Sequence, residues 1–221
     1  MKPLTFLLTA ALLSAANLSA CSEPENGMSI QEQTEKRFQL NPHPKQAYQI
    51  KIKTDDAPGP LKLVNNMDVG YIADNCSYII SKVAGASAKP EKHFPIRIQQ
   101  IGQNEYETKV YLDAMQDEDY FGQGVCHWKM MGFGTSFKAT GRLEETRFNV
   151  SDLIENLIKE KIITKYYWKG AYPYYKNADG SMQKRIDGVG ATEFGEPLTN
   201  YRPDQYKDLF KITVTLEELK Q

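Results

Sequence analysis

The side chains best able to do chemistry are three cysteines, Cys21, Cys76 and Cys126, and three histidines, His43, His93 and His127. Cys126 and His127 are adjacent, which would suit a thiolate nucleophile activated by an imidazole. Neighbouring residues of a strand point to opposite faces, however, so we do not expect this pair to act together. The cysteines form no Cys-x-x-Cys and the histidines have no His-Glu-x-x-His spacing. Neither thiol exchange nor a zinc site is therefore predicted.

Other candidate groups for catalysis lack the partners that they would need. Ser181 has no second glycine of a nucleophile elbow, and no histidine follows it in the chain. Glu193 and Glu196 could act as an acid pair, although no pattern places them in a cleft. Two glycine-rich segments, Gly132-Phe133-Gly134 and Gly188-Val189-Gly190, lack the lysine of a phosphate loop and are interpreted as turns. We expect no catalytic residue, no cofactor and no enzyme activity.

A cluster of acidic residues could bind an ion. Its members are Asp113, Asp117, Glu118 and Asp119. Carboxylates suit calcium, but the alternate spacing and the central glycine of a calcium loop are absent. The favoured interpretation is a solvated turn between strands, and the sequence predicts no metal site.

The N-terminal residues have the pattern of an export signal. Lys2 supplies a positive charge, and the apolar run after it is too short to cross a bilayer as a permanent helix. The run ends in Leu18-Ser19-Ala20-Cys21, which resembles the lipobox of bacterial lipoproteins. The resemblance implies that residues 1–20 are a signal peptide, that Cys21 is acylated after cleavage, and that the lipid anchors the protein to a membrane. Ser22 stands where the family's inner-membrane retention signal would be aspartate. For a Gram-negative host, the resemblance implies an outer-membrane lipoprotein facing the periplasm.

Cys76 and Cys126 are expected to form a disulfide. If Cys21 is acylated, these two cysteines remain in a compartment where disulfides form and persist. Closing a loop of about 50 residues contributes roughly 4 kcal/mol in the chain-entropy model. The alternative is two separately buried thiols.

Length and charge predict one domain that does not bind nucleic acid. Without residues 1–20 the 221-residue chain has 201, and the loss of Lys2 leaves 26 basic against 28 acidic residues, a net charge near −2. This balance gives no basis for binding nucleic acid. With 41% hydrophobic residues, the chain can bury a core of ordinary size. We expect a flexible tether over 21–46, which is polar and without an apolar period, and a single β-rich domain over 47–221.

Alternation of apolar and polar residues predicts strands through most of that domain. Ile50 and Ile52 share one face against Lys51 and Lys53. Similar alternation or strand-like composition recurs around 96–100, 106–112, 125–130, 136–139, 147–150 and 210–216. Short turns between such segments favour antiparallel pairing.

Two segments have helical spacing instead. Asp152 could cap a helix, Glu155 could complete a capping box, and an apolar stripe follows the same spacing: Leu153, Ile154, Leu157 and Ile158. A second helix is indicated over about 69–83 by Ile72, Cys76, Ile79, Ile80 and Val83. The expected fold class is α+β, mainly antiparallel β-sheet with one or two helices packed on it and one disulfide.

One segment is unusually rich in large aromatic rings: Tyr166, Tyr167, Trp168, Tyr172, Tyr174 and Tyr175. Tyr and Trp are enriched in interfaces, where they supply broad contact area at low entropy cost. The segment is therefore a predicted binding site for a protein partner. The alternative is that about half of the rings fill the core.

Two further segments complete the layout: Cys126-His127-Trp128-Lys129 in a strand and Tyr201-Arg202-Pro203-Asp204-Gln205-Tyr206 near the end. A tethered, disulfide-bonded β-rich domain with these segments resembles the periplasmic immunity lipoproteins that accompany antibacterial type VI secretion effectors. The resemblance implies a protein that binds and neutralises a toxin, with phospholipases among the toxin classes. A structural or assembly lipoprotein of the envelope and an inhibitor of a foreign hydrolase stay open as alternatives, as does the oligomeric state.

Overall fold

The chain folds mainly as antiparallel β-sheet with few helices, which confirms the broad α+β prediction. The computed structural model describes residues 28–220 except 178 and 183–187. The strands are β1 (Ala47–Asp55), β2 (Lys62–Leu63), β3 (Met67–Ile72), β4 (Tyr78–Ser81), β5 (Ala86–Ala88), β6 (Glu91–Ile96), β7 (Gln99–Gln100), β8 (Glu105–Tyr111), β9 (Lys129–Lys138), β10 (Arg147–Leu153), β11 (Ile162–Trp168), β12 (Thr192–Phe194) and β13 (Leu209–Glu218). The helices are α1 (Ile30–Glu35), α2 (Ile154–Glu160) and the short 3-10 turns η2 (Lys169–Ala171), η3 (Leu198–Asn200) and η4 (Pro203–Asp208).

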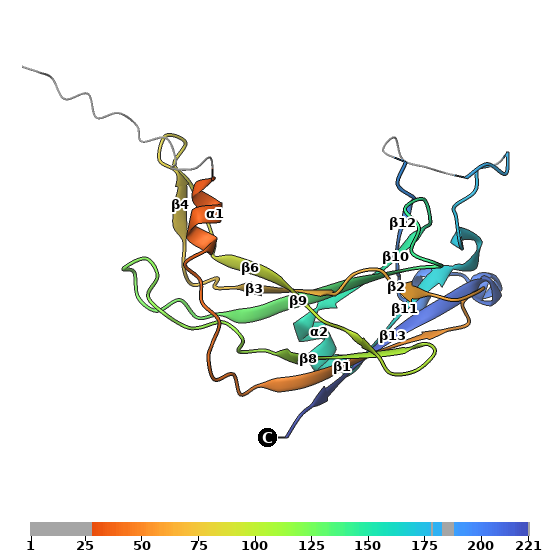
Figure 1. Ribbon diagram of the computed structural model, residues 1–221, viewed down its shortest axis with the longest axis horizontal. Helices are drawn as coiled ribbons and strands as arrows, with labels where there is room; N and C mark the ends of the chain where they lie inside the picture. Colours follow the sequence, from red (N-terminus) through yellow and green to blue (C-terminus); the bar gives the residue numbers. More distant parts are fainter. Residues whose placement is uncertain (1–27, 178, 183–187, 221) are drawn as a thin grey trace, which may run out of the picture.

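Two sheets stack as layers around a shared apolar core (Figure 1). The first sheet has the strand order β11–β13–β1–β8–β7, and the second has the order β12–β10–β9–β3–β6 with β2 beside β9. Neighbours in the first sheet pair antiparallel, whereas β10 and β12 pair in parallel. Ile50 of β1 lies opposite Leu216 of β13, so that apolar side chains of neighbouring strands meet on one face.

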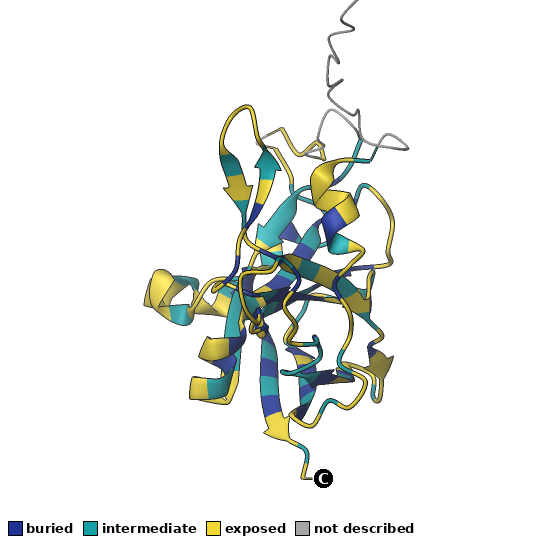
Figure 2. Cartoon of the chain, turned by 90° about the vertical axis from the view of Figure 1, so that its left-hand side faces the viewer, coloured by how far each residue is buried: buried dark blue, intermediate teal, exposed yellow. Residues whose placement is uncertain are grey.

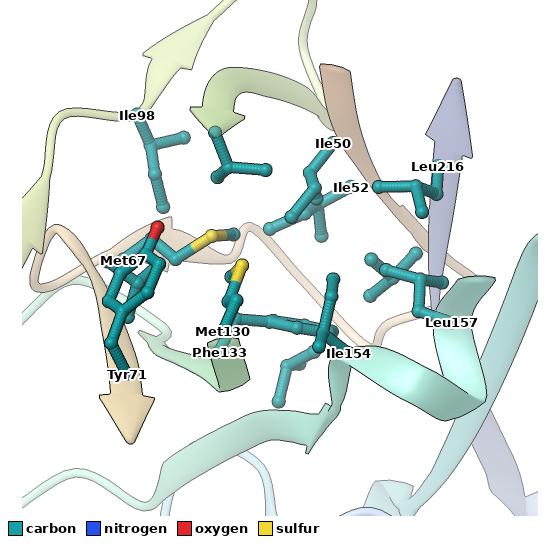
Figure 3. Close-up of a cluster of buried hydrophobic side chains, with 14 of the residues drawn as sticks. Ile50, Ile52, Met67, Tyr71, Ile98, Met130, Phe133, Ile154, Leu157 and Leu216 are labelled. Atoms are coloured by element: carbon teal, nitrogen blue, oxygen red, sulfur yellow. The ribbon is translucent and has the colours of Figure 1, made fainter. Parts of the chain in front are cut away.

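The core between the two layers accounts for the period of two along the strands. Side chains from both sheets and from α2 point toward one another in Figure 3: Ile50, Ile52 and Leu216 from the first sheet, Met67, Tyr71, Met130 and Phe133 from the second, and Ile154 and Leu157 from the helix. Each fully buried aliphatic side chain contributes roughly 1.5–3 kcal/mol. The polar residues that alternate with these side chains face outward. The outer faces of the two sheets are therefore available for binding.

The apolar stripe of α2 packs on the core as predicted, but the start of the helix differs from the prediction. Ile154 and Leu157 are 2% and 0% exposed. The helix begins after Leu153, and no side chain caps it there. Asp152 accepts hydrogen bonds from the Leu153 backbone N–H and the Asn156 amide, at 2.9 and 2.7 Å. The predicted capping box is wrong because Asp152 belongs to β10, where its carboxylate binds the side chain of Lys165.

The second predicted helix, over 69–83, is wrong. β3 crosses the second sheet, and after a turn β4 and β5 form a hairpin. Ile72 ends β3, Cys76 lies in the turn and Ile79 lies in β4. Their intervals of four and three residues are the same as those of an apolar helix face, although the residues belong to two strands and a turn. Burial on β3 instead follows a strand, with Val69 and Tyr71 both 0% exposed.

The segment expected to be a flexible tether is folded from residue 28 onward. α1 begins after Ser29, which forms a capping box with Glu32. Phe38 is 7% exposed, and its ring packs edge-on against that of Trp128 with centroids 4.9 Å apart. The predicted domain boundary at 47 is therefore wrong, because the Phe38 ring and the backbone hydrogen bonds of Gln39 and Asn41 with Gln116 and Ala114 hold this polar segment on the core. Residues 1–27, which include the predicted signal peptide and Cys21, lie outside the described residues.

α1 and the β4–β5 hairpin project from the same end of the sandwich (Figures 1 and 2). The predicted disulfide between Cys76 and Cys126 is confirmed, with Cα atoms 5.5 Å apart, and it joins the base of the hairpin to the chain before β9. The ring of Tyr78 stacks on Phe121 with centroids 5.5 Å apart. The disulfide and the stacked rings connect the hairpin to the core. Within the described residues, no helix is long and apolar enough to cross a membrane.

Candidate functional site

A groove of about 500 Å³ lies on the outer face of the second sheet. Its lining comes from Asp68 and Gly70 on β3, His93 on β6, Met131, Gly132, Phe133 and Gly134 on β9, Ser151, Asp152 and Leu153 on β10, and Lys165 on β11. In Figure 1 the second sheet is the upper layer. Its outer face lies between α1 and the β4–β5 hairpin at one end and the chain around β12 at the other.

The floor of the groove is backbone, because glycines occupy outward positions on neighbouring strands. Gly70 of β3 lies opposite Gly132 of β9, and Asp68 lies opposite Gly134. A Cβ on Gly132 would come within 2.7 Å of the Asp152 carbonyl oxygen, so glycine is required there. A Cβ on Gly134 would meet nothing closer than 3.6 Å. Gly134 therefore leaves open space that a larger side chain would fill.

A histidine and an aspartate mark one end of the groove. The Nδ1 atom of His93 lies 3.0 Å from the Oδ2 atom of Asp68, and the side chains are 49% and 56% exposed. The imidazole lies over Gly70, where a Cβ would be 2.7 Å from its Cε1 atom. The pair offers a partner one carboxylate and one imidazole ring.

A largely buried ion pair marks the other end. The Oδ2 atom of Asp152 lies 2.7 Å from Nζ of Lys165, and the side chains are 12% and 20% exposed. Burial by itself raises the pKa of Asp152, but the Lys165 ammonium and the Asn156 amide outweigh it and hold the pKa below its usual value. Asp152 is therefore ionised at neutral pH, and the pair fixes a positive and a negative group beside the groove.

The groove does not bring its serine and its histidine together. Ser151 on β10 and His93 on β6 both line it, but β9 and β3 separate their strands. Three inter-strand spacings amount to roughly 14 Å, far beyond the hydrogen-bond reach that a nucleophile and its base require. The site can instead recognise a polypeptide through backbone, charge and the apolar side chains of Met131 and Leu153.

The predicted aromatic site does not form one surface. Tyr167 is 0% exposed, its ring stacks on Phe210, and its hydroxyl donates to the Asn149 carbonyl at 2.7 Å. Tyr167 is therefore a core residue, and its predicted contact with a partner is wrong. Strand alternation places Tyr166, which is half-buried, and Trp168, which is 36% exposed, on the opposite face of β11.

The remaining rings of that segment pack beside the start of β10. Tyr172 stacks on Phe148 and donates its hydroxyl to the Pro60 carbonyl at 2.9 Å. Tyr175 packs partly against the core. Tyr174 lies between them and is half-buried, in a stretch whose backbone bonds to Thr146 on both sides. Tyr167 therefore belongs to the core, as the alternative interpretation of the aromatic segment expects, and Tyr172 and Tyr175 belong to it in part.

The acidic cluster organises turns. Asp113 accepts hydrogen bonds from the backbone of Lys45 and Gln46, and Asp119 accepts from Phe121 and Gln123. Within 28–220, apart from the six residues left undescribed, no three His, Cys, Asp or Glu side chains gather as a metal site.

His127 belongs to the same turn. The Oδ2 atom of Asp117 lies 2.7 Å from its Nδ1 atom, and the Trp128 backbone N–H donates to Oδ1 of the same carboxylate. Cys126 is in the disulfide, so it is not a thiol that His127 could activate.

Glu193, considered as an acid, lies on β12 beside the aromatic core. Burial raises the pKa of its carboxyl, against the effect of a hydrogen bond from the Trp168 backbone N–H. Glu196 pairs its backbone with Tyr166 and accepts a hydrogen bond from the Asn200 amide. The two carboxylates thus have separate structural partners.

The prediction of a turn at the glycines of the groove is wrong. Gly132-Phe133-Gly134 lies in the middle of β9, where Phe133 points into the core and the glycines face outward. The signal available was a bulky residue between two glycines, which is a period of two. Their alignment with Asp68 and Gly70 depends on the pairing of β3 with β9 and has no local signature.

Comparisons with protein-family models, with curated proteins and with solved structures find no match to this chain.

Proposed function

We propose that this protein is a lipid-anchored binding protein of the outer membrane, facing the periplasm, and that it binds a protein partner in the groove of the second sheet. The observation that carries the proposal is the groove itself, which has a backbone floor, a histidine in contact with an aspartate at one end and an ion pair at the other. A flat floor admits a loop or an extended segment of another protein. The charged ends can set its orientation.

Several features of the groove fit a polypeptide. Its volume of about 500 Å³ can hold a few side chains. Leu153 is 52% exposed at its rim and offers an apolar contact beside the charged ends. Tyr174 is half-buried beside the start of β10, away from the residues that line the groove, and keeps the role proposed for the aromatic segment as a separate partner contact. Small contacts of this type bind through a central anchor surrounded by polar contacts.

The partner that we propose is an antibacterial toxin delivered to the periplasm, which makes this chain an immunity protein. The support is the lipobox at Cys21, the disulfide between Cys76 and Cys126, and the resemblance described above. A phospholipase is the toxin class that we favour, because an immunity protein held at a membrane is placed where such an enzyme acts.

The test is to export the product of each neighbouring gene to the periplasm of a sensitive host, with and without this protein, and to count survivors. Gly134→Leu fills the groove at a position with space for a side chain. We expect it to abolish protection and to keep the melting temperature near that of the wild type. Thr215→Leu, a half-buried position on the first sheet, is the matched control and should keep protection.

Three results would contradict the proposal. If no neighbouring product is toxic, or if this protein does not protect against one that is, the immunity function is wrong. An assembly role would then be indicated if deletion of the gene weakens the envelope. If Gly134→Leu protects fully and Thr215→Leu does not, the partner binds the first sheet.

A further inference from the structure

The β4–β5 hairpin ends in a tip that is apolar and basic. Val83, at the tip, is 99% exposed, and Ile79, nearer the base of the hairpin, is 57% exposed. From Tyr78 to Lys89 the chain contains two lysines, Lys82 and Lys89, and no acidic residue. Isolated apolar residues are common on protein surfaces, but a fully exposed valine next to a lysine at a projecting tip suits the boundary between water and lipid.

The hairpin is held firmly to the body of the protein. The disulfide at Cys76 lies just before β4, and Tyr78 stacks on Phe121. α1 projects from the same end, and it is held there by the hydrogen bond of 3.1 Å from Nζ of Lys92 to the Glu35 carbonyl. The start of the described chain and the hairpin tip thus belong to one rigid end of the molecule.

The chain before this end is short. Cys21 precedes Met28 by seven residues, and seven residues span at most about 25 Å when fully extended. If Cys21 carries the lipid, Met28, which lies just before α1, must stay within that distance of the bilayer, and the neighbouring hairpin is held near it.

We propose that the tip of the β4–β5 hairpin inserts into the headgroup region of the membrane that holds the lipid anchor. The inference rests on the anchoring included in the proposed function. Val83 contacts the acyl boundary, and Lys82 binds lipid phosphate. Lipid and hairpin together give two points of attachment, which fix the orientation of the domain. The outer face of the second sheet lies on the side from which the hairpin projects, so a partner in the groove is held close to the bilayer (Figure 1).

The test uses the full-length, acylated protein in vesicles of phosphatidylethanolamine and phosphatidylglycerol. Val83→Cys is labelled with an environment-sensitive fluorophore, and Gln103→Cys, at an exposed turn of the first sheet, is the matched control. Flotation of the vesicles reports the anchor. We expect the label at 83 to shift to shorter wavelengths and to lose most of its emission when brominated lipids are included. The label at 103 should show neither effect and should be quenched by aqueous iodide.

The possible results separate the two claims. If the protein floats and the label at 83 is quenched by iodide as fully as the label at 103, the anchor stands and the hairpin inference is wrong. A blue shift without quenching by brominated lipid would show that protein covers the tip, either a partner or a second copy, and would also overturn the inference. If the acylated chain does not float, the anchor and the inference fail together.

Discussion

The Asp152 carboxylate of the second sheet lies 2.7 Å from the Lys165 ammonium of the first, in an ion pair that joins the two layers beside α2. Since both side chains are largely buried, removing one partner leaves the other charge without compensation. Asp152→Ala and Lys165→Met should each lower the free energy of unfolding by about 3 kcal/mol, and the double variant should lose much less than the sum. Urea denaturation measures these values.

The exposed pair of Lys51 and Glu217, at 2.9 Å, is the matched control. Glu217→Ala should change the free energy of unfolding by less than about 1 kcal/mol. The pH dependence adds a second check. Folding lowers the pKa of Asp152, so the stability from the pair is present above the ordinary carboxyl pKa and is lost as the pH falls through the folded-state value. The difference between wild type and Asp152→Ala should therefore narrow in acid, and a constant difference would contradict this account.

Glu193 should show the opposite pH dependence. Burial raises the pKa of its carboxyl above the usual 4.5, so folding favours the protonated form. The stability that this group contributes is present at low pH and is lost as the pH rises from the unfolded-state to the folded-state pKa. Glu193→Gln should have a higher melting temperature than the wild type at neutral pH, with the difference vanishing at low pH. A melting temperature below that of the wild type at pH 7 would show that the carboxylate stabilises the fold.

The strands were predictable because each sheet buries one face. Ile50 and Ile52 alternate with lysines, and the structure places both isoleucines in the core. The segment 28–46 was not predictable by the same rule, because Phe38 is a single ring in a polar stretch and its contacts, Trp128 and Tyr120, come from far along the chain. A periodic pattern reveals the buried face of a strand or helix, whereas a single buried residue such as Phe38 has no pattern to reveal it.

The groove could not be predicted from local sequence patterns either. Its floor exists because Gly132 and Gly134 of β9 lie opposite Gly70 and Asp68 of β3. That alignment is set by the register of two strands separated by more than fifty residues, and a β-bulge shifts it at Gly70 and Tyr71. The disulfide, by contrast, could be predicted, because exclusion of Cys21 left one possible pair.

The disulfide should be important for stability. Cys76 and Cys126 are separated by 50 residues in the chain. Replacing both by serine should lower the free energy of unfolding by roughly 4 kcal/mol, because the unfolded chain regains the entropy of an open loop. Urea titration of the oxidised protein and of the double variant measures the difference. A loss below about 1 kcal/mol would mean that the fold holds these positions together without the bond.

Acylation should depend on one sulfur atom. Cys21→Ser removes the thiol that accepts the diacylglycerol in the proposed lipoprotein, so the variant should carry no lipid and should leave the membrane fraction. Metabolic labelling with a radioactive fatty acid, followed by immunoprecipitation, checks this. Cys76→Ser is the control and should be labelled like the wild type. Label on Cys21→Ser would show that another group is acylated.

The rings of the aromatic segment should separate into stabilising and binding residues. Tyr167→Ala should lower the free energy of unfolding by about 3 to 5 kcal/mol, since the ring is fully buried, and Tyr167→Phe by about 1 kcal/mol through loss of its bond to Asn149.

Tyr174 and Trp168 are both partly exposed, but they lie beside different sheets: Trp168 ends β11, and Tyr174 lies beside the start of β10. Tyr174 lies beside the start of β10 on the second sheet, so Tyr174→Ala should weaken partner binding by about 2 kcal/mol at a nearly unchanged melting temperature if the ring is an anchor. Trp168 lies on the first sheet. Trp168→Ala should therefore change the free energy of partner binding and the free energy of unfolding each by no more than about 0.5 kcal/mol. Calorimetric titration with the partner, together with thermal unfolding of each variant, gives both numbers. If Trp168→Ala alone loses affinity, the interface is on the first sheet and the groove is not the binding site. If Tyr174→Ala loses stability along with affinity, its ring packs as part of the core.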